Sequence, residues 1–284
     1  MSTAIFTDSI FADELVSIKL HFGPHASDNV LRVARVFMAI NKCTERLRRL
    51  YRNLGAGGNT TSLGKVLWPN PTVDPADSTE GIPDLEFFSK VDRLRGTPIN
   101  QTTIDEENKR HAIYLARMCT KGGASAVDVL VKFAVKYNAT AHRLLADHDP
   151  PLAPALYSCE RVIGDMFMVV MEYIPNSKGA SLYGTSLSPS ALESVHQGVS
   201  QALGLLHGKN LVFGDLRELN VLYLPEEDRA LLVDFDGVGR DGEDRYSACL
   251  NHEVGLGVVR LQIMEKSHDD ENLKKLMDRL SGRL

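Results

Sequence analysis

The chain has 284 residues, of which 43% are hydrophobic and 24% are charged. Those proportions exclude a disordered or fibrous chain, and the length is enough for one large domain or two smaller lobes around a sizeable core. The formal net charge of -5 gives the whole chain no attraction for the phosphates of nucleic acid or for anionic lipid. We therefore expect a packed protein with no nucleic-acid partner and no membrane partner.

The cysteines and the first residues indicate the compartment. No two of the four cysteines have the C-x-x-C spacing of metal or redox sites, so free thiols in a reducing compartment are expected. Residues 1–18 carry three acidic residues and neither a basic start nor a continuous apolar stretch, which argues against a signal peptide. The longest apolar run, Met166 to Ile174, is too short to span a bilayer. The sequence predicts a cytoplasmic protein, with the nucleus left open.

The first part of the chain is predicted to be helical and then loop-like. From Asp28 to Leu54, apolar residues recur at the spacing of an amphipathic helix, which Gly55 would end. Its other face carries arginines, among them Arg46, Arg48 and Arg49; this is either a solvated face, which we favour, or a docking surface for an acidic partner. Residues 55–61 and 68–83 are rich in Gly, Pro, Asn and Asp. Residues 1–110 are therefore predicted to form an N-terminal helical extension and linker.

A β-rich half is predicted to follow, over residues 111–174. Four short runs have strand character, and a helix-like stretch that ends before Pro150-Pro151 lies between the second run and the third. The predicted strands are His111 to Met118, Val127 to Phe133, Ala155 to Val162 and Met166 to Ile174, and the predicted helix is Asn138 to Asp147.

A helix and several hairpins are predicted over residues 175–284. The helix has one apolar stripe, a capping box of Ser190 and Glu193, and a stop at Gly208. Short strands are then expected at Leu211 to Phe213, Val221 to Leu224 and Ala230 to Val233, and a last helix near Asp270 to Leu280. The whole pattern predicts an α+β fold with a β-rich first lobe and a short helical second lobe.

Two polar motifs stand where the hairpins begin and end. The first is Gly214-Asp215-Leu216-Arg217-Glu218-Leu219-Asn220; the second is Asp234-Phe235-Asp236-Gly237, fourteen residues after Asn220 and directly after an apolar run. The pair resembles the catalytic loop and the metal-binding loop of the protein-kinase-like superfamily. The residues of the two motifs are most similar to those of divergent fungal-type kinases. Three flanking segments are similar to that group too: Leu152-Ala153-Pro154, Met171-Glu172-Tyr173 and Asp244-Arg245-Tyr246.

This resemblance implies a role for each polar residue of the motifs. Asp215 would orient or deprotonate the acceptor hydroxyl, and Arg217 would place its charge on the transferring phosphoryl group. Asn220 and Asp234 would hold the magnesium ion, because hard oxygen ligands suit a hard cation. The expected cofactors are ATP and magnesium.

Two upstream elements would complete a nucleotide site. Lys132 lies in an apolar strand, as the phosphate-binding lysine of the family does, and a lysine in such a strand needs an anion beside it. An exposed edge strand is the alternative. Glu172 and Tyr173 follow a buried strand and would supply the hinge whose backbone binds adenine, although such a run is also ordinary core.

Several positions depart from the family pattern. No G-x-G-x-x-G precedes Lys132, and only Gly122-Gly123 is available; the helix offers His142 where a glutamate would pair with the lysine. Phe213 and Gly214 replace the usual histidine and arginine. Asp236 is either an extra magnesium ligand or a solvent-facing carboxylate. The acidic residues Asp241, Glu243 and Asp244 are expected to form a solvated loop, with orientation of a basic acceptor as the alternative.

The sequence thus predicts a two-lobed kinase-like domain over residues 111–284. We expect an ATP- and magnesium-dependent phosphotransferase whose acceptor is a serine or threonine hydroxyl of a protein. One alternative is an inactive pseudokinase that binds a nucleotide or a protein partner, favoured by the missing Gly-rich loop and helix glutamate. A second is a small-molecule kinase of the aminoglycoside or choline phosphotransferase type, favoured by the 47 residues (284 - 237) that follow Gly237.

Overall fold

The computed structural model describes residues 2–6, 9–13, 34–46, 48, 68–73, 81–92, 98–99, 112–119, 126–162, 166–247 and 259–282. The chain divides into two compact units, Met1–Trp68 and Pro69–Leu284. The predicted boundary at residue 110 lies elsewhere because β3 (Leu85–Val91) pairs with β5 (Ile113–Cys119) in the second unit. Leu85, Phe87 and Val91 follow a strand's period of two, a signal that could have revealed β3 in the sequence.

The first unit contains a hairpin and a helix. Strands β1 (Ser2–Phe6) and β2 (Ser9–Asp13) pair antiparallel. Residues 34–46 are helical, inside the predicted helix; both ends of that prediction, with Arg49, lie outside the described residues. Phe37 and Met38 are exposed, as is Arg46. Docking of an acidic partner on this helix stays a prediction.

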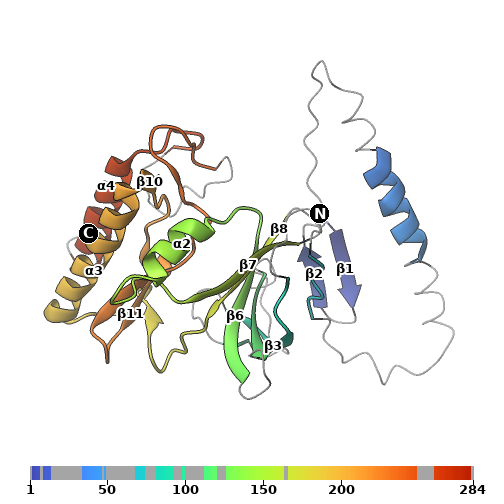
Figure 1. Cartoon of the computed structure of the whole chain (residues 1–284), viewed down its shortest axis with the longest axis horizontal. Helices are drawn as coiled ribbons and strands as arrows, with labels where there is room; N and C mark the ends of the chain where they lie inside the picture. The colour runs from blue at the N-terminus through green and yellow to red at the C-terminus, as the bar shows by residue number, and fades with distance from the viewer. Residues whose placement is uncertain are drawn as a thin grey trace. The chain divides into compact units, whose positions relative to one another are not determined.

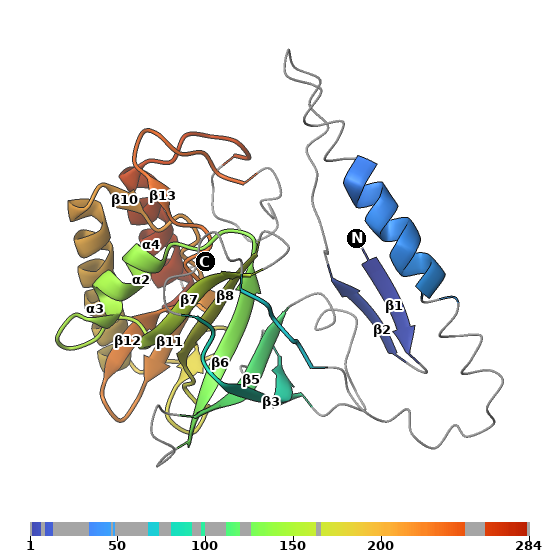
Figure 2. The ribbon, with the colours of Figure 1, turned by 45° about the vertical axis from the view of Figure 1, so that its right-hand side comes forward.

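The second unit begins with a six-stranded antiparallel sheet in the order β4-β3-β5-β6-β8-β7 (Figure 2). All four predicted strands of this half are confirmed. They are β5, β6, β7 and β8, and the two further strands are β3 and the short β4. The bounds not yet given are β4 (Pro98–Ile99), β6 (Ala126–Ala134), β7 (Leu156–Val162) and β8 (Met166–Glu172).

The helix α2 (Ala139–Ala146) follows β6 and packs against β7 and α3 (Figure 1). Asn138 caps it, since its side-chain oxygen accepts a hydrogen bond from the backbone N–H of Ala141 at 3.0 Å. The predicted helix at Asn138 to Asp147 is therefore confirmed. Ala141, His142 and Leu145 are its buried residues, and they face the core that the two lobes share.

The second lobe is built on α3 (Pro189–Gly208) and α4 (Lys266–Leu280), which pack together (Figure 1). The predicted capping box is wrong: Ser188, not Ser190, is the N-cap, and its hydroxyl accepts from Ala191 N at 3.2 Å. The physical reason is Pro189, whose fixed φ and missing N–H suit the first helical position. No helix within the described residues is long and apolar enough to cross a bilayer.

Short strands lie on either side of the two motifs in this lobe. The hairpin of β11 (Val221–Leu224) and β12 (Arg229–Leu232) pairs with β9 (Ala180–Ser181), while β10 (Leu211–Val212) pairs with β13 (Gly239–Arg240). The three predicted short strands are thus confirmed, each within one residue at either end. The first motif enters a 3₁₀ turn at Glu218–Asn220 immediately before β11, and the second motif begins two residues after β12. The hairpin therefore brings the ends of the two motifs together.

Candidate functional site

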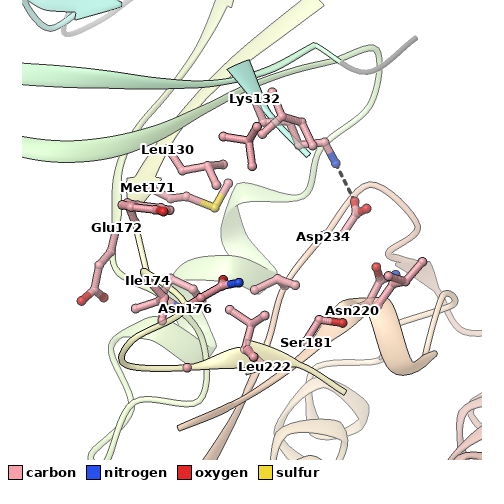
Figure 3. A pocket seen from close by; sticks show the side chains of 18 of the residues that line it. Leu130, Lys132, Met171, Glu172, Ile174, Asn176, Ser181, Asn220, Leu222 and Asp234 are labelled. Atoms are coloured by element: carbon pink, nitrogen blue, oxygen red, sulfur yellow. Dashed lines mark hydrogen bonds and ion pairs between the residues drawn. The ribbon is translucent and has the colours of Figure 1, made fainter. Parts of the chain in front are cut away.

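A cavity of about 140 Å³ lies between the sheet and the second lobe (Figure 3). Its walls are apolar side chains from both lobes, such as Leu130 and Met171 from the sheet and Leu222 from β11. Lys132, Asn220 and Asp234 line the same cavity. A slot with apolar walls and polar groups gathered at one end is the shape that a small molecule with a flat apolar part and a charged part requires.

Lys132 projects from β6 toward the second motif. Its Nζ lies 2.6 Å from Asp234 Oδ1 and 2.7 Å from Asp236 Oδ2. Burial by itself favours the neutral amine, but the two carboxylates outweigh that effect, and the pKa of Lys132 is raised above its ordinary value. The lysine is therefore a cation held at the end of the cavity, and the edge-strand alternative does not describe it.

The two aspartates of the second motif have different surroundings. Asp234 has a φ of 72°, in the left-handed region that non-glycine residues rarely adopt and that clusters at functional sites. Burial, and then the neighbouring Asp234, raise the pKa of Asp236 to about 7 against the opposing effect of Lys132. Among the described residues, Asp236 Oδ1 is buried without a hydrogen-bond partner and Oδ2 contacts Lys132, while the side chain as a whole is 38% exposed. Asp236 is therefore only partly exposed to solvent.

Asn220 joins the two motifs. Its amide nitrogen donates to the backbone oxygen and to Oδ2 of Asp215, both at 2.8 Å, which leaves its amide oxygen available to a ligand. The backbone of Asn220 accepts from Val233 N at 3.0 Å, and Val233 directly precedes Asp234. Asn220 and Asp234 therefore lie on one wall of the cavity, as the sequence predicted (Figure 3).

Arg217 lies against Asp215 rather than in the cavity. Its NH2 is 3.0 Å from Asp215 Oδ2, and both side chains are mostly buried. Arg217 Nε is buried without a hydrogen-bond partner. The arginine thus places positive charge on the carboxylate that was predicted to act as the base. Its predicted contact with a phosphoryl group stays a prediction.

Glu172 and Tyr173 line the cavity where β8 ends. The Glu172 carboxylate accepts from Ala155 N at 3.2 Å, and its side chain points away from the cavity (Figure 3). Glu172 therefore lines the cavity through atoms other than its carboxylate, and Tyr173 and Ile174 line it beside Glu172. That arrangement is compatible with the predicted hinge.

Helix α2 has His142 at the place where the kinase pattern has a glutamate, and the His142 ring packs in a group of aromatic rings. The ring of His142 is fully buried and stacks on Phe235, with centroids 4.5 Å apart and an interplanar angle of 9°. Phe235 in turn meets Phe213 edge to face at 5.7 Å. Phe213 and Phe235, one from just before the first motif and one from the second, are therefore connected to α2 through the ring of His142. Residues 139–146 contain no Asp or Glu, so no carboxylate of this helix can reach Lys132.

His142 is fixed on both of its nitrogens. Tyr137 Oη lies 2.7 Å from Nδ1 and Pro154 O lies 2.7 Å from Nε2, so the tyrosine donates to Nδ1 and Nε2–H donates to the carbonyl. Burial lowers the pKa of His142 to about 4, although the bond to Pro154 acts in the other direction. The imidazole is neutral at physiological pH and serves as a packing element.

Asp269 holds the backbone at the start of the first motif, and it was not among the predicted site residues. It lies in the first turn of α4, is fully buried, and accepts from Phe213 N at 2.7 Å and from Gly214 N at 2.9 Å. His207 Nε2 lies 3.0 Å from the same carboxylate. The backbone just before Asp215 is thus fixed from a helix more than fifty residues downstream. No local pattern marks Asp269, because its partners, two backbone N–H groups and the ring of His207, are distant in sequence.

The geometry explains why residue 214 is glycine. Gly214 has a φ of 78°, and a Cβ there would lie 2.8 Å from the backbone oxygen of Gly237. A Cβ at Gly237 would lie 3.1 Å from Asp215 Cβ. The two loops therefore approach each other more closely than side chains at these positions would permit.

The acidic residues after the second motif bind within the loop and to α4. Asp244 Oδ2 accepts from Arg240 N at 2.7 Å, and Asp241 Oδ1 accepts from Lys266 N at 3.0 Å. Glu243 Oε2 in turn lies 3.3 Å from NH1 of Arg240, so all three carboxylates predicted to be merely solvated have partners. Orientation of a basic acceptor by this cluster stays a prediction.

The roof of the cavity differs from what the sequence analysis assumed. Gly122-Gly123 lies outside the described residues. Val91 and Asp92, at the end of β3, and Ile113, at the start of β5, line the cavity. The described residues on this side of the cavity therefore come from β3, which was not predicted, and from the start of β5, which was.

The donor set suits a magnesium ion that is shared with a phosphate. In the part of the chain that the structure describes, no group of three or more His, Cys, Asp or Glu could hold a metal by itself. Magnesium usually keeps water and substrate oxygens as ligands and takes only one or two carboxylates from protein. Asp234 and the amide oxygen of Asn220 meet that requirement, and the unpartnered Oδ1 of Asp236 is a further oxygen beside them.

Comparison with known proteins gives partial similarities. No protein-family model matches the sequence. Over 80 residues the chain is 35% identical to the serine/threonine-protein kinase meng-po of Drosophila melanogaster, a stretch that spans 28% of this chain and 18% of that kinase. The structure of the Cydia pomonella granulovirus kinase PK-1 aligns with a TM-score of 0.49 at 18% identity, over 70% of this chain and 69% of the viral one.

The narrower resemblance to fungal-type kinases stays a prediction. The order of elements and the two motifs meeting at one cavity are what the resemblance implied for the fold. The chain has a mixed α+β fold, and over a short stretch it is similar in sequence to a serine/threonine kinase.

Proposed function

We propose that the second unit binds magnesium-ATP and transfers the terminal phosphoryl group to a hydroxyl. The observation that carries this proposal is the convergence of Lys132, Asn220 and Asp234 on one cavity with apolar walls. A cation, a neutral oxygen and an anionic oxygen at one end of such a cavity match a nucleotide whose adenine lies in the slot and whose metal-bound phosphates lie at its end.

The residues of the chain would divide the work as follows. Leu130, Met171 and Leu222 enclose the adenine ring. Lys132 neutralises charge on the phosphates, and Asn220 with Asp234 would hold the magnesium, which supplies electrostatic stabilisation of the transferring group when it is bound. Asp215, kept in place by Asn220, accepts the proton of the acceptor hydroxyl.

The acceptor we propose is a serine or threonine hydroxyl of a protein. The similarity to a serine/threonine kinase over 80 residues supports this choice. A small-molecule acceptor remains the alternative. Transfer of labelled phosphate to a peptide library, compared with transfer to a panel of amino- and hydroxyl-bearing metabolites, separates the two acceptors. Asp215→Ala is the blank for both reactions.

Nucleotide binding is tested first, because that test does not depend on the acceptor. Magnesium-ATP should raise the Tm of the wild-type protein, and the shift should be clearly smaller in Lys132→Met and in Asp234→Asn. Lys136→Met is the matched control, since Lys136 is an exposed lysine just beyond the end of β6. Equal shifts in wild type and Lys132→Met would refute the proposed site.

A second candidate is a pseudokinase that binds the nucleotide without transferring phosphate. The observation in its favour is that Asp215 Oδ2 already has two partners, Asn220 at 2.8 Å and Arg217 at 3.0 Å, and both stabilise the ionised carboxylate against accepting a proton. It predicts a normal Tm shift with magnesium-ATP and no phosphate transfer by either wild type or Asp215→Ala.

A further inference from the structure

The lysine at the end of the cavity has two carboxylates, and both come from the same short loop. Asp234 and Asp236 each lie within 2.7 Å of Lys132 Nζ. A cation that is mostly removed from water needs a compensating anion at all times, because an unpaired buried charge is costly. If Asp234 turns its oxygens to magnesium, a second carboxylate that stays in place keeps the ammonium group of Lys132 paired and fixed while the phosphates bind.

Among the described residues, Asp234 and Asp236 are the only carboxylates that form an ion pair with Lys132. Helix α2 presents the neutral ring of His142 to the second motif, and its residues include no Asp or Glu. The carboxylate of Glu172, at the end of the neighbouring strand β8, is bonded to Ala155 N. Asp236 is therefore the residue positioned to remain with Lys132.

The loop that carries Asp236 is held in place from two sides. Phe235 stacks on His142, and its backbone oxygen accepts from Asn138 N at 3.2 Å at the start of α2. On the other side, Gly237 lies so close to Asp215 that a Cβ would approach it to 3.1 Å. A carboxylate between two such anchors has a fixed position, as an ion pair that directs another side chain requires.

We infer that Asp236 is a positioning residue that holds the ammonium group of Lys132 toward the nucleotide phosphates, in the absence of any carboxylate on α2. The inference rests on the proposed function. It differs from a role as magnesium ligand, because it assigns the effect of Asp236 to Lys132 rather than to the metal. It also gives a reason for the aspartate at position 236, because α2, which packs on Phe235 through His142, has no carboxylate for Lys132.

A double-mutant cycle on magnesium-ATP binding tests this assignment. Asp236→Asn keeps the shape and removes the charge, and we expect it to raise the Kd on the order of tenfold, the factor of one charge-assisted hydrogen bond. In the Lys132→Met background the same change should alter the Kd less than about twofold, because the group it acts through is gone. Asp236→Glu should recover part of the affinity.

The rival role gives a different result. If Asp236 is mainly a metal ligand, Asp236→Asn weakens binding equally with and without Lys132, and it raises the magnesium concentration needed for half-saturation; either result overturns the inference. Glu243→Gln is the control for loss of one acidic charge from the same segment, since Glu243 contacts only the exposed Arg240 in the described part of the chain. It should leave the Kd unchanged.

Thermal unfolding without nucleotide separates failure of this inference from failure of the proposed function. If wild type binds no nucleotide, the proposed function fails, and the ion pair is then judged by the Tm of the four proteins of the cycle. A double variant whose Tm change differs from the sum of the two single changes supports the pair. Additive changes overturn it.

Discussion

The amide nitrogen of Asn220 donates to Asp215 twice, once to the carboxylate and once to the backbone carbonyl, at 2.8 Å each. Asn220 is 2% exposed, so these bonds are made away from solvent. One residue thus fixes the rotamer of the candidate base and the backbone that carries it. The same side chain also faces the cavity, so the candidate base and the candidate metal site are mechanically linked.

Replacing Asn220 should therefore affect both stability and chemistry. In Asn220→Ala the backbone oxygen of Asp215 loses its amide donor, and we expect a loss of about 1–3 kcal/mol of unfolding free energy. Phosphate transfer should fall at least about a hundredfold, because the base and the metal site are disturbed together. Urea unfolding and a transfer assay measure the two effects.

Asn272→Ala provides the comparison for Asn220→Ala. Asn272 is also buried, but it lies on α4, and its amide nitrogen has no hydrogen-bond partner. It should change stability without changing transfer per folded molecule. Equal losses of transfer in the two variants would show that Asn220 acts through the fold alone.

Asp269→Asn tests the anchor of the catalytic loop. The amide keeps the size of the carboxylate but replaces one charged acceptor with an NH₂ group that faces the N–H of Phe213 or Gly214. Hydrogen bonds to charged groups contribute about 1.5–3 kcal/mol, so we expect a loss of stability in that range. The Kd for magnesium-ATP should stay within about threefold of wild type while kcat falls. A kcat unchanged per folded molecule would contradict the positioning role.

Gly214→Ala tests the close approach of the two motif loops. An alanine at φ 78° is strained, and its Cβ would meet the backbone of Gly237, so we expect a loss of about 1–3 kcal/mol or more. The matched control is Gly204→Ala in the middle of α3, where a Cβ meets no atom within 4 Å. That change should stabilise the protein by up to about 1 kcal/mol. An unfolding free energy of Gly214→Ala equal to or above that of wild type would show that residue 214 tolerates a side chain.

Acid should destabilise the protein in part through His142. Its pKa is lowered by burial to about 4 in the folded state, against 6.5 for an unperturbed histidine. Between those two pKa values the unfolded chain binds one more proton than the folded chain. The contribution of buried, neutral His142 to the free energy of unfolding is therefore complete above pH 6.5 and is lost as the pH falls toward 4. The total is about 3 kcal/mol, with a slope of about 1.4 kcal/mol per pH unit.

The comparison for this prediction is His142→Phe, which keeps an aromatic ring against Phe235 and cannot titrate. Between pH 4.5 and 6 the unfolding free energy of wild type should rise more steeply with pH than that of the variant, by the slope given above. Carboxylates contribute to both proteins and cancel in the difference. A His142 proton resonance that titrates with a midpoint near 6.5 would contradict the burial argument.

Much of the fold and part of the site could be predicted from local patterns. Strands β5 to β8 have apolar runs bounded by breaks, and α2 and α3 have apolar faces with capping residues near their starts. The two motifs have a fixed spacing across a hairpin, which by itself brings Asn220 close to Asp234. Features of this kind depend on residues that are neighbours in sequence, so the sequence contains them directly.

The rest depended on contacts between residues that are far apart in the chain. Asp269 binds the backbone of Phe213 and Gly214 across more than fifty residues, and Lys132 meets Asp234 and Asp236 across more than a hundred. Neither pairing has a local signal. The sequence by itself determined which groups were available: a buried lysine, two acids in one loop, and a helix without a carboxylate. Only the tertiary structure decided which of them meet, because ion pairs and backbone anchors form wherever packing brings opposite groups together out of water.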